Sequence, residues 1–217
     1  MTFDWLQGRD YGTGMEIRPV TGDDLTDLTR LFDSSGVLSG CWCMFFLLSG
    51  KEFGAGWGAT NRARFAELAA ATLEPMGLLA YRQGEPVGWC AAGPRARYGR
   101  ILRSPLMKGR EVAEDATVWV VPCFFVRRDA RRTGVTRALL RAAVDLAAEH
   151  GATAVEGLPL AAGGRHPSAE AYVGTEDVFA ACGFQPTSRP SPRRLVMRRA
   201  LSPRRRSAQG TGARTGP

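Results

Sequence analysis

Apolar residues in this chain of 217 residues are arranged in two kinds of run. Nearly unbroken apolar runs, rich in β-branched and aromatic side chains, predict buried strands, and the longest covers residues 117–126. Apolar residues three or four positions apart predict amphipathic helices, and the clearest series runs from Val135 to Leu146. His150-Gly151 then supplies a helix stop. We therefore expect the chain to be organised around a buried strand followed by a long helix.

The remaining runs predict further elements on both sides of this unit. Strands are expected at 15–20, 77–82, 87–92, 152–159, from Phe184 onward and at 194–198, and helices at 25–32, 61–73 and 169–182. This order is typical of an α/β fold, a mixed central β-sheet with helices on both faces. The domain is expected to cover residues 15–201. Residues 1–14 predict an irregular extension, and residues 202–217, rich in Arg, Ser, Pro and Gly, predict a disordered basic tail.

The turn between the central strand and its helix has the character of an anion site. The first backbone N–H groups of a helix have no internal partner, and the positive end of the helix dipole adds to their attraction for phosphate groups. Two arginines and one glycine stand at this point. We therefore expect a pyrophosphate group to bind the segment Arg131-Arg132-Thr133-Gly134-Val135-Thr136.

This segment resembles the acyl-CoA loop, Arg/Gln-x-x-Gly-x-Gly/Ala, of the GNAT superfamily of N-acetyltransferases. Residues 126–131 are similar to the Val-x-Pro-x-x-Arg lead-in of that loop, and Cys182-Gly183-Phe184 is similar to the late Gly-Phe of the family. The resemblance covers residues 15–201 and implies the GNAT fold, with acetyl-CoA as co-substrate and direct attack by an amine. It also implies that Phe124 and Val126 pair their backbones with the pantetheine arm.

The chain departs from the family pattern at three positions. Thr136 replaces a smaller residue at the end of the loop, and Arg128 replaces the proline of the lead-in. Phe179 stands where the family often has a tyrosine that donates a proton to the leaving thiolate. Tyr172, about two helical turns earlier, is the nearest substitute and is taken as the candidate general acid.

Composition narrows the class of protein. A hydrophobic content of 44% predicts a folded domain, and no apolar run is long enough to span a membrane. No secretory signal precedes the first strand, and five cysteines without a repeating spacing do not predict a disulfide framework, so a cytoplasmic setting is expected. Much of the net charge of +8 lies between Arg189 and Arg214. A solvated tail therefore explains the charge better than a nucleic-acid partner does.

Two segments are candidates for binding the amine acceptor. Gly40-Cys41-Trp42-Cys43-Met44 is either a buried structural segment or the acceptor wall, which makes Cys41 and Trp42 candidate contacts, and it resembles a subgroup of small-molecule acetyltransferases. Its Cys-x-Cys lacks a second ligand pair, so no metal is expected. In the basic loop at 94–100, Arg95 and Tyr98 either face solvent or orient an anionic part of the acceptor.

Glu156 is the candidate general base, because a carboxylate on a core strand beside a cleft can accept a proton from the attacking amine. The alternative is that Glu156 pairs with an arginine. His166 is the second candidate for the base, whereas His150 ends a helix and is expected to act as a dipole-stabilising cap. Cys123 is expected to be a buried packing residue.

These observations predict an acetyl-CoA-dependent N-acetyltransferase acting on a small-molecule amine, such as an antibiotic or specialised metabolite. One alternative acceptor is a protein or peptide amine, for which Arg95, Arg97 and Arg100 could hold an acidic segment. Another alternative is a non-catalytic module that binds acyl-CoA. A third is nucleic-acid binding through the tail, and the choice between monomer and homodimer stays open.

Overall fold

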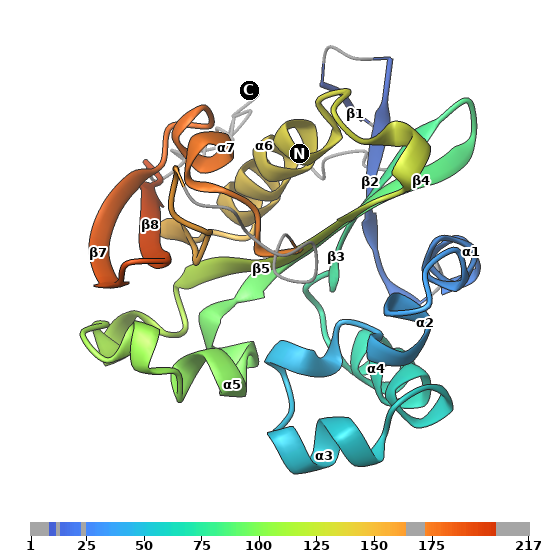
Figure 1. The fold of residues 1–217 in the computed structure, drawn as a ribbon, viewed down its shortest axis with the longest axis horizontal. Coiled ribbons are helices and arrows are strands. Elements are labelled where there is room, and N and C mark those ends of the chain that lie inside the picture. The colour runs from blue at the N-terminus through green and yellow to red at the C-terminus, as the bar shows by residue number, and fades with distance from the viewer. Residues whose placement is uncertain (1–8, 12–13, 23–24, 164–171, 203–217) are drawn as a thin grey trace, which may run out of the picture.

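An eight-stranded mixed sheet lies at the centre of the protein in the computed structural model, which describes residues 9–11, 14–22, 25–163 and 172–202 (Figure 1). The strand order is β1-β2-β3-β4-β5-β6-β8-β7, and neighbouring strands are antiparallel except for the parallel pair β5–β6. The strands are β1 (Arg9–Asp10), β2 (Glu16–Val20), β3 (Gly77–Arg82), β4 (Glu85–Pro94), β5 (Val118–Val126), β6 (Ala154–Gly157), β7 (Gln185–Ser191) and β8 (Arg194–Ala200).

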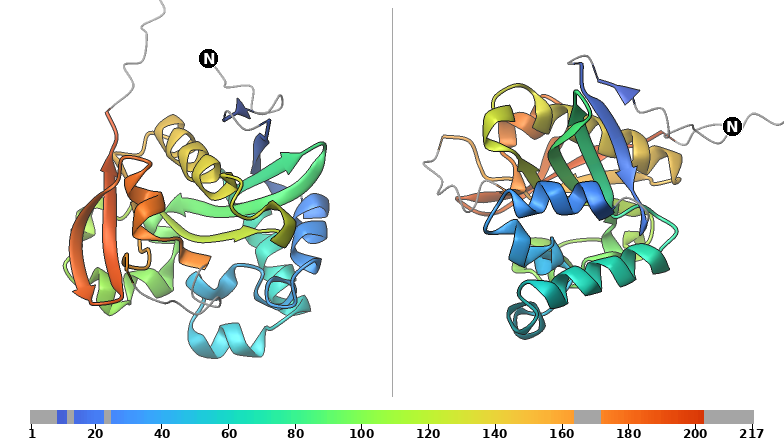
Figure 2. Two further views of the ribbon diagram at one scale, coloured as in Figure 1. Left: turned by 45° about the horizontal axis from the view of Figure 1, so that its top comes forward. Right: turned by 90° about the vertical axis from the view of Figure 1, so that its right-hand side faces the viewer.

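Helices cover both faces of the sheet (Figures 1 and 2). One face carries α6 (Val135–Glu149) and the short α7 (Glu176–Ala180). The other face carries α1 (Leu25–Asp33), α2 (Leu38–Cys41), α3 (Gly50–Ala55), α4 (Ala59–Ala71) and α5 (Gly99–Leu102). The predicted α/β class, with a mixed central sheet and helices on both faces, is confirmed.

The core consists of an apolar layer on each face. The predicted apolar stripe of α6, from Val135 to Leu146, is buried against the sheet. Gly88 of β4 permits this close approach, because a Cβ atom there would lie 2.6 Å from the Val135 side chain. On the opposite face, Phe65 of α4 packs with Trp89 of β4 and with neighbouring aromatic residues. The sheet is thus buried on both sides, as the long apolar run of β5 predicts.

The neighbouring strands β5 and β6 separate partway along their length. β5 pairs with β6 only from Val118 to Val121, opposite Ala154 to Gly157. On its other side, three residue steps of β5 match two steps of β4, so β5 contains a β-bulge, and Pro122 lies within it. Proline has no N–H to give to a neighbouring strand, and β6 ends at Gly157. Within the described part of the chain, residues 122–126 therefore have no strand on the β6 side.

Several local expectations need correction. Arg9 and Asp10 pair with β2, so the N-terminal extension is not wholly irregular. The basic loop at 94–100 is largely helical, because it contains a 3₁₀ turn at Arg95–Arg97 and the start of α5. The predicted helix at 169–182 is reduced to α7, with residues 169–171 outside the described part. The predicted tail also lies outside it from residue 203 onward. Among the helices that are described, none is long and apolar enough to cross a membrane.

Candidate functional site

The loop before α6 has the geometry of an anion site. Arg132 and Gly134 have positive φ angles of 61° and 88°, so the chain turns sharply just before the helix begins at Val135. Thr133 holds the turn, because its hydroxyl donates to the carbonyl of Ala130 at 2.7 Å and accepts from Arg82 at 2.9 Å. No side chain of the described residues caps the N terminus of α6. Its first N–H groups are therefore available to an anion.

The charged side chains of this loop are not equivalent. Arg127 forms a two-pronged ion pair with Asp129, with both N–O distances at 2.8 Å, and this pair lowers the pKa of the Asp129 carboxyl. Arg131 instead extends along the strand end, where its Nε donates to the carbonyl of Val126 at 3.1 Å. Arg132 is exposed. Arg128 is exposed as well, so the positive charge that this loop offers to a ligand comes from Arg128, Arg131 and Arg132.

The free edge of β5 leads away from this loop. The N–H of Arg127 donates to the carbonyl of Val87, so the backbone of Arg127 faces β4. Because successive residues of a strand point their N–H and C=O groups to opposite sides, Phe125 also faces β4, whereas Phe124 and Val126 face the gap left by β6. The acceptance of an Arg131 hydrogen bond by the Val126 carbonyl agrees with this direction. The two residues singled out for pantetheine pairing thus present the unpaired edge.

A cavity of about 800 Å³ connects the loop, the free strand edge and an apolar chamber. Arg131 and Thr136 line its end at α6, and β5 contributes a side wall. The chamber lies on the α1–α5 face of the sheet and is formed chiefly by the segment between α1 and α4. The full lining consists of Val37, Leu38, Cys41, Phe45, Phe46, Phe53, Trp57, Cys123, Phe124, Phe125, Val126, Arg131, Thr136, Tyr172, Val173 and Arg194.

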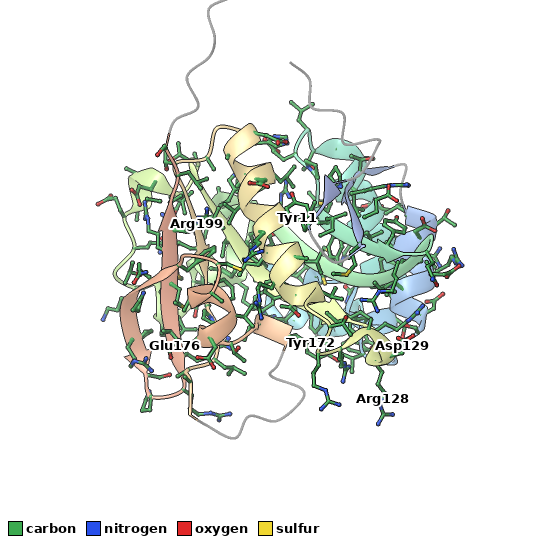
Figure 3. All side chains as sticks on the ribbon, turned by 90° about the horizontal axis from the view of Figure 1, so that it is seen from above. Tyr11, Arg128, Asp129, Tyr172, Glu176 and Arg199 are labelled. Atoms are coloured by element: carbon green, nitrogen blue, oxygen red, sulfur yellow. The ribbon has the colours of Figure 1, made fainter. Side chains whose placement is uncertain are left out.

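Tyr172 reaches this cavity, whereas Phe179 does not. The Tyr172 ring stacks on Phe125, with ring centroids 6.5 Å apart and an interplanar angle of 21°. Figure 3 shows Tyr172 on the same side of the molecule as Arg128 and Asp129, which precede α6. Phe179 is fully buried on the opposite face of the sheet, packed against Phe184. The position that often carries the family's tyrosine is therefore part of the core here.

Glu156 does not lie beside the cavity, where a general base for the attacking amine is expected. It is buried and is not among the residues that line the cavity. Its Oε2 accepts from Arg95 Nη1 at 2.8 Å, and its Oε1 accepts from Arg198 Nη1 at 3.1 Å. Both carboxylate oxygens are thus engaged by guanidinium groups, which is the pairing alternative. His166 lies outside the described residues.

Arg95, Tyr98 and Trp42 also do not face the cavity. The Arg95 side chain is 0% exposed, and it donates to Asp115, to Glu156 and to the carbonyl of Glu111. Tyr98 is buried, and this burial raises its pKa. Trp42 is 2% exposed and packs edge-on against Phe32 and tilted against Phe65. The structure thus places these three side chains in the core and not at the cavity, so it gives no support to the prediction that they bind the acceptor.

Of the cysteines, Cys41 and Cys123 line the cavity. Burial is the main reason that the pKa of Cys41 is raised to about 12, so it is a thiol at neutral pH. Cys123 is largely buried, as expected, and its Sγ lies 3.9 Å from that of Cys43. Across the described residues, no group of three His, Cys, Asp or Glu side chains is placed to hold a metal ion.

Sequence reasoning missed most of the aromatic wall of the chamber. Phe45, Phe53 and Trp57 line it, and Phe45 and Trp57 remain 39% and 53% exposed. Exposed aromatic rings that adjoin one another, as Phe45, Phe53 and Trp57 do, form the kind of contiguous apolar patch that marks a binding site. The high aromatic content of residues 42–57 was the available signal, but only the fold shows which rings face outward. Arg194, from the start of β8, was likewise missed.

Comparisons with known proteins identify the family and agree with the fold. The model of the acetyltransferase (GNAT) family matches residues 42–173, more than half of the chain. The GNAT domain of S. lividans PAT is 18% identical, with 86% of this chain and 90% of that chain covered and a TM-score of 0.51. A GNAT-family protein from Desulfovibrio desulfuricans is 16% identical, with 87% and 99% covered and a TM-score of 0.50. An acetyltransferase from Thermus thermophilus is 19% identical, with 86% and 97% covered and a TM-score of 0.49. A search of curated proteins gave no match.

Proposed function

Because this chain belongs to the acetyltransferase (GNAT) family, we propose that it transfers the acetyl group of acetyl-CoA to the amine of a small molecule. One observation carries the proposal. A single cavity runs from the anion loop, along the unpaired edge of β5, into an apolar chamber. This arrangement would place a pyrophosphate, an extended pantetheine arm and an acceptor amine in that order.

The residues of the cavity fit acetyl-CoA. The first N–H groups of α6, with the side chains of Arg131 and Arg132, would hold the pyrophosphate. The N–H of Phe124 points into the gap beside β5, where it would pair with the pantetheine arm or polarise the thioester carbonyl. Arg131 Nε already binds the Val126 carbonyl, so that carbonyl is held in place beside the arm. Gly134 supplies the left-handed turn that brings the backbone close to the ligand.

Acetyl-CoA supplies an activated acyl group with a good leaving thiolate. The protein positions the two substrates and protonates the thiolate as it leaves. The amine must be neutral when its lone pair forms the new C–N bond and the C–S bond breaks. Tyr172 lines the cavity and is the proposed donor of a proton to the leaving sulfur. The amine loses its proton to solvent, and the tyrosinate takes up a proton from solvent before the next turnover. We assign no general base, since Glu156 is engaged by two arginines.

Within the GNAT family, the chamber favours a small molecule over an acidic peptide. The peptide alternative relied on Arg95, Arg97 and Arg100. Arg95 is fully buried, Arg97 donates to the carbonyls of Glu74 and Pro75, and Arg100 donates to the carbonyl of Leu48. Tyr172 in the cavity favours an enzyme over a non-catalytic module. All five cysteines are free thiols, which fits the proposed cytoplasmic setting.

The test is calorimetric titration of acetyl-CoA into the wild-type protein and two variants. Gly134→Glu places bulk and negative charge in the anion loop, and we expect acetyl-CoA binding to be lost. Gly84→Glu is the matched control, because Gly84 also has a positive φ angle, 77°, but lies in the β3–β4 turn with open space around a Cβ atom. It should bind acetyl-CoA as the wild type does. Normal binding by Gly134→Glu would refute the cofactor assignment.

A further inference from the structure

The outer wall of the chamber is a continuous series of aromatic rings. Phe45 packs edge-to-face against Phe46 and against Phe53, with ring centroids 5.0 and 5.4 Å apart. Phe53 in turn packs edge-to-face against Trp57 at 5.6 Å. Edge-to-face packing of this kind fixes ring orientations and leaves ring surfaces open to a ligand. Tyr172, which also lines the cavity, is stacked on Phe125.

The position of Trp57 is set by a glycine. A Cβ atom on Gly40 would lie 2.0 to 2.5 Å from three atoms of the Trp57 indole, so the ring rests directly on the backbone of α2. The Gly40 carbonyl also accepts from the N–H of Gly58 and from the buried Asn61 side chain. These contacts seat an indole that is 53% exposed at the cavity. Because the Trp57 indole is held in place by the backbone and is still exposed, it is a preorganised surface for a ligand.

The charged residues that line the cavity are positive, whereas Glu52, beside Phe53, accepts from the N–H of Ser49 at the start of α3 and does not line it. The Arg100 guanidinium lies 4.1 Å from the centre of the Phe45 ring and 5.8 Å from that of Phe53, although Arg100 does not line the cavity. The charged residues in the described lining are Arg131 and Arg194, and no carboxylate of the described residues joins them. An acceptor with additional ammonium groups would lose hydration in this chamber without gaining a counter-charge. A flat apolar group would lose nothing and would bury aromatic surface.

We propose that the acceptor is an amine carried on an aromatic body, which stacks in the chamber against Trp57 and Phe45 and faces Tyr172. The inference rests on the proposed acetyl transfer, and it adds the substrate class. Gly40 is then a positioning residue, because it acts through the Trp57 ring. Trp57 and Phe45 determine specificity, and they contact the acceptor rather than acetyl-CoA.

The test uses conjugates in which CoA is joined through an acetyl bridge to an amine, so that binding is measured without turnover. Three amines are compared: phenethylamine, ethylamine and a linear diamine. Calorimetric titration is made with the wild-type protein, Trp57→Ala and Leu73→Ala. Leu73 is the matched control, because it is apolar and 95% exposed but does not line the cavity. A fourth conjugate, to the N terminus of a short alanyl peptide, represents a polypeptide acceptor.

We expect the phenethylamine conjugate to bind the wild type at least about tenfold more tightly than the ethylamine conjugate, a typical effect of one buried ring. Trp57→Ala should remove this difference and leave CoA binding unchanged, whereas Leu73→Ala should retain it. Equal binding of the phenethylamine and ethylamine conjugates, or tightest binding of the diamine or peptide conjugate, would overturn the substrate class alone. Failure of CoA and of every conjugate to bind would overturn the proposed function as well.

Gly40→Ala gives an independent readout of the positioning step. We expect it to displace the indole and weaken the phenethylamine conjugate while CoA itself binds normally. If that variant loses secondary structure by circular dichroism, Trp57→Leu is used in its place. A Trp57→Leu protein that still distinguishes phenethylamine from ethylamine would contradict the role assigned to the indole.

Discussion

Arg95 Nη1 lies 2.8 Å from Glu156 Oε2, and both side chains are almost completely buried. Arg198 holds the other oxygen of Glu156 and also pairs with Glu114, whose pKa is lowered chiefly by that hydrogen-bonded arginine. Asp115 is the second carboxylate that pairs with Arg95. The Glu156 carboxylate thus links β6 to the turn after β4, which carries Arg95, and to β8, which carries Arg198. We therefore propose that Glu156 joins structural elements rather than moving protons.

Glu156→Gln should therefore destabilise the protein without changing the chemistry. The amide removes the negative charge that the buried Arg95 and the partly buried Arg198 share. Breaking a buried pair such as Arg95–Glu156 costs about 3 kcal/mol. Urea unfolding should show the loss, while the pH dependence of kcat should match that of the wild type. Glu67→Gln, on the exposed surface of α4, is the control and should leave the unfolding midpoint unchanged. A shifted pH profile in Glu156→Gln would restore the carboxylate as the general base.

Tyr172→Phe tests the proposed general acid. The change keeps the ring that stacks on Phe125 and removes only the proton donor, so kcat should fall by about 10²-fold while acetyl-CoA binding is retained. Assays of thiol release over a range of pH give kcat, and calorimetry gives the dissociation constant of acetyl-CoA. Tyr81→Phe removes a tyrosine hydroxyl that donates to Asp27; neither residue lines the cavity, so this variant should keep kcat. Equal kcat values for Tyr172→Phe and the wild type would exclude the hydroxyl as proton donor.

The sequence was sufficient to predict the central strand, the long helix and the sharp turn between them, because hydrophobic period and turn chemistry are local properties. The split in the sheet also has local causes that were available. Pro122 interrupts the apolar run of β5, and Pro159 follows the end of β6 soon afterwards. Both prolines limit strand pairing, so together they indicate where β5 is left with a free edge.

The side-chain partners could not be predicted in the same way. Glu156 meets Arg95 and Arg198 across separations of 61 and 42 residues, and the register of three strands and a loop decides that meeting. The same holds for Trp42 and Trp57. Both belong to one aromatic segment, but one is buried in the core and the other faces the cavity, because the left-handed backbone at Trp42 and Cys43 turns the chain between them.

His150 should make stability depend on pH in the neutral range. The sequence suggested a charged helix cap, but the imidazole lies against Trp119 and burial lowers its pKa below the usual value. A lowered folded-state pKa means that the unfolded chain binds a proton first as pH falls. The stability contributed by neutral His150 is therefore present above the unfolded pKa of about 6.5 and decreases as pH falls through the lower folded pKa.

The urea midpoint of the wild type should accordingly be lower at about pH 5.5 than at about pH 7.5, a range in which Asp and Glu stay ionised in the unfolded chain. His150→Gln should show a smaller difference between the two pH values. His166 is present in both proteins, so its contribution cancels in the comparison. An identical pH difference in the two proteins would mean that protonation of His150 does not oppose folding.

Cys41 tests whether the transfer is direct. It lines the cavity, and a covalent route would need its thiolate to attack the thioester. Burial, with a further contribution from the neighbouring Cys43, raises its pKa to about 12, so little thiolate exists at neutral pH. Its alkylation by iodoacetamide, followed by peptide mass spectrometry, should rise about tenfold for each pH unit, with no plateau near the usual thiol pKa of about 8.5. A plateau near that value, together with acetylated Cys41 after incubation with acetyl-CoA alone, would replace direct attack by a two-step mechanism. Steadily rising alkylation without an acetylated cysteine leaves the amine as the group that attacks acetyl-CoA.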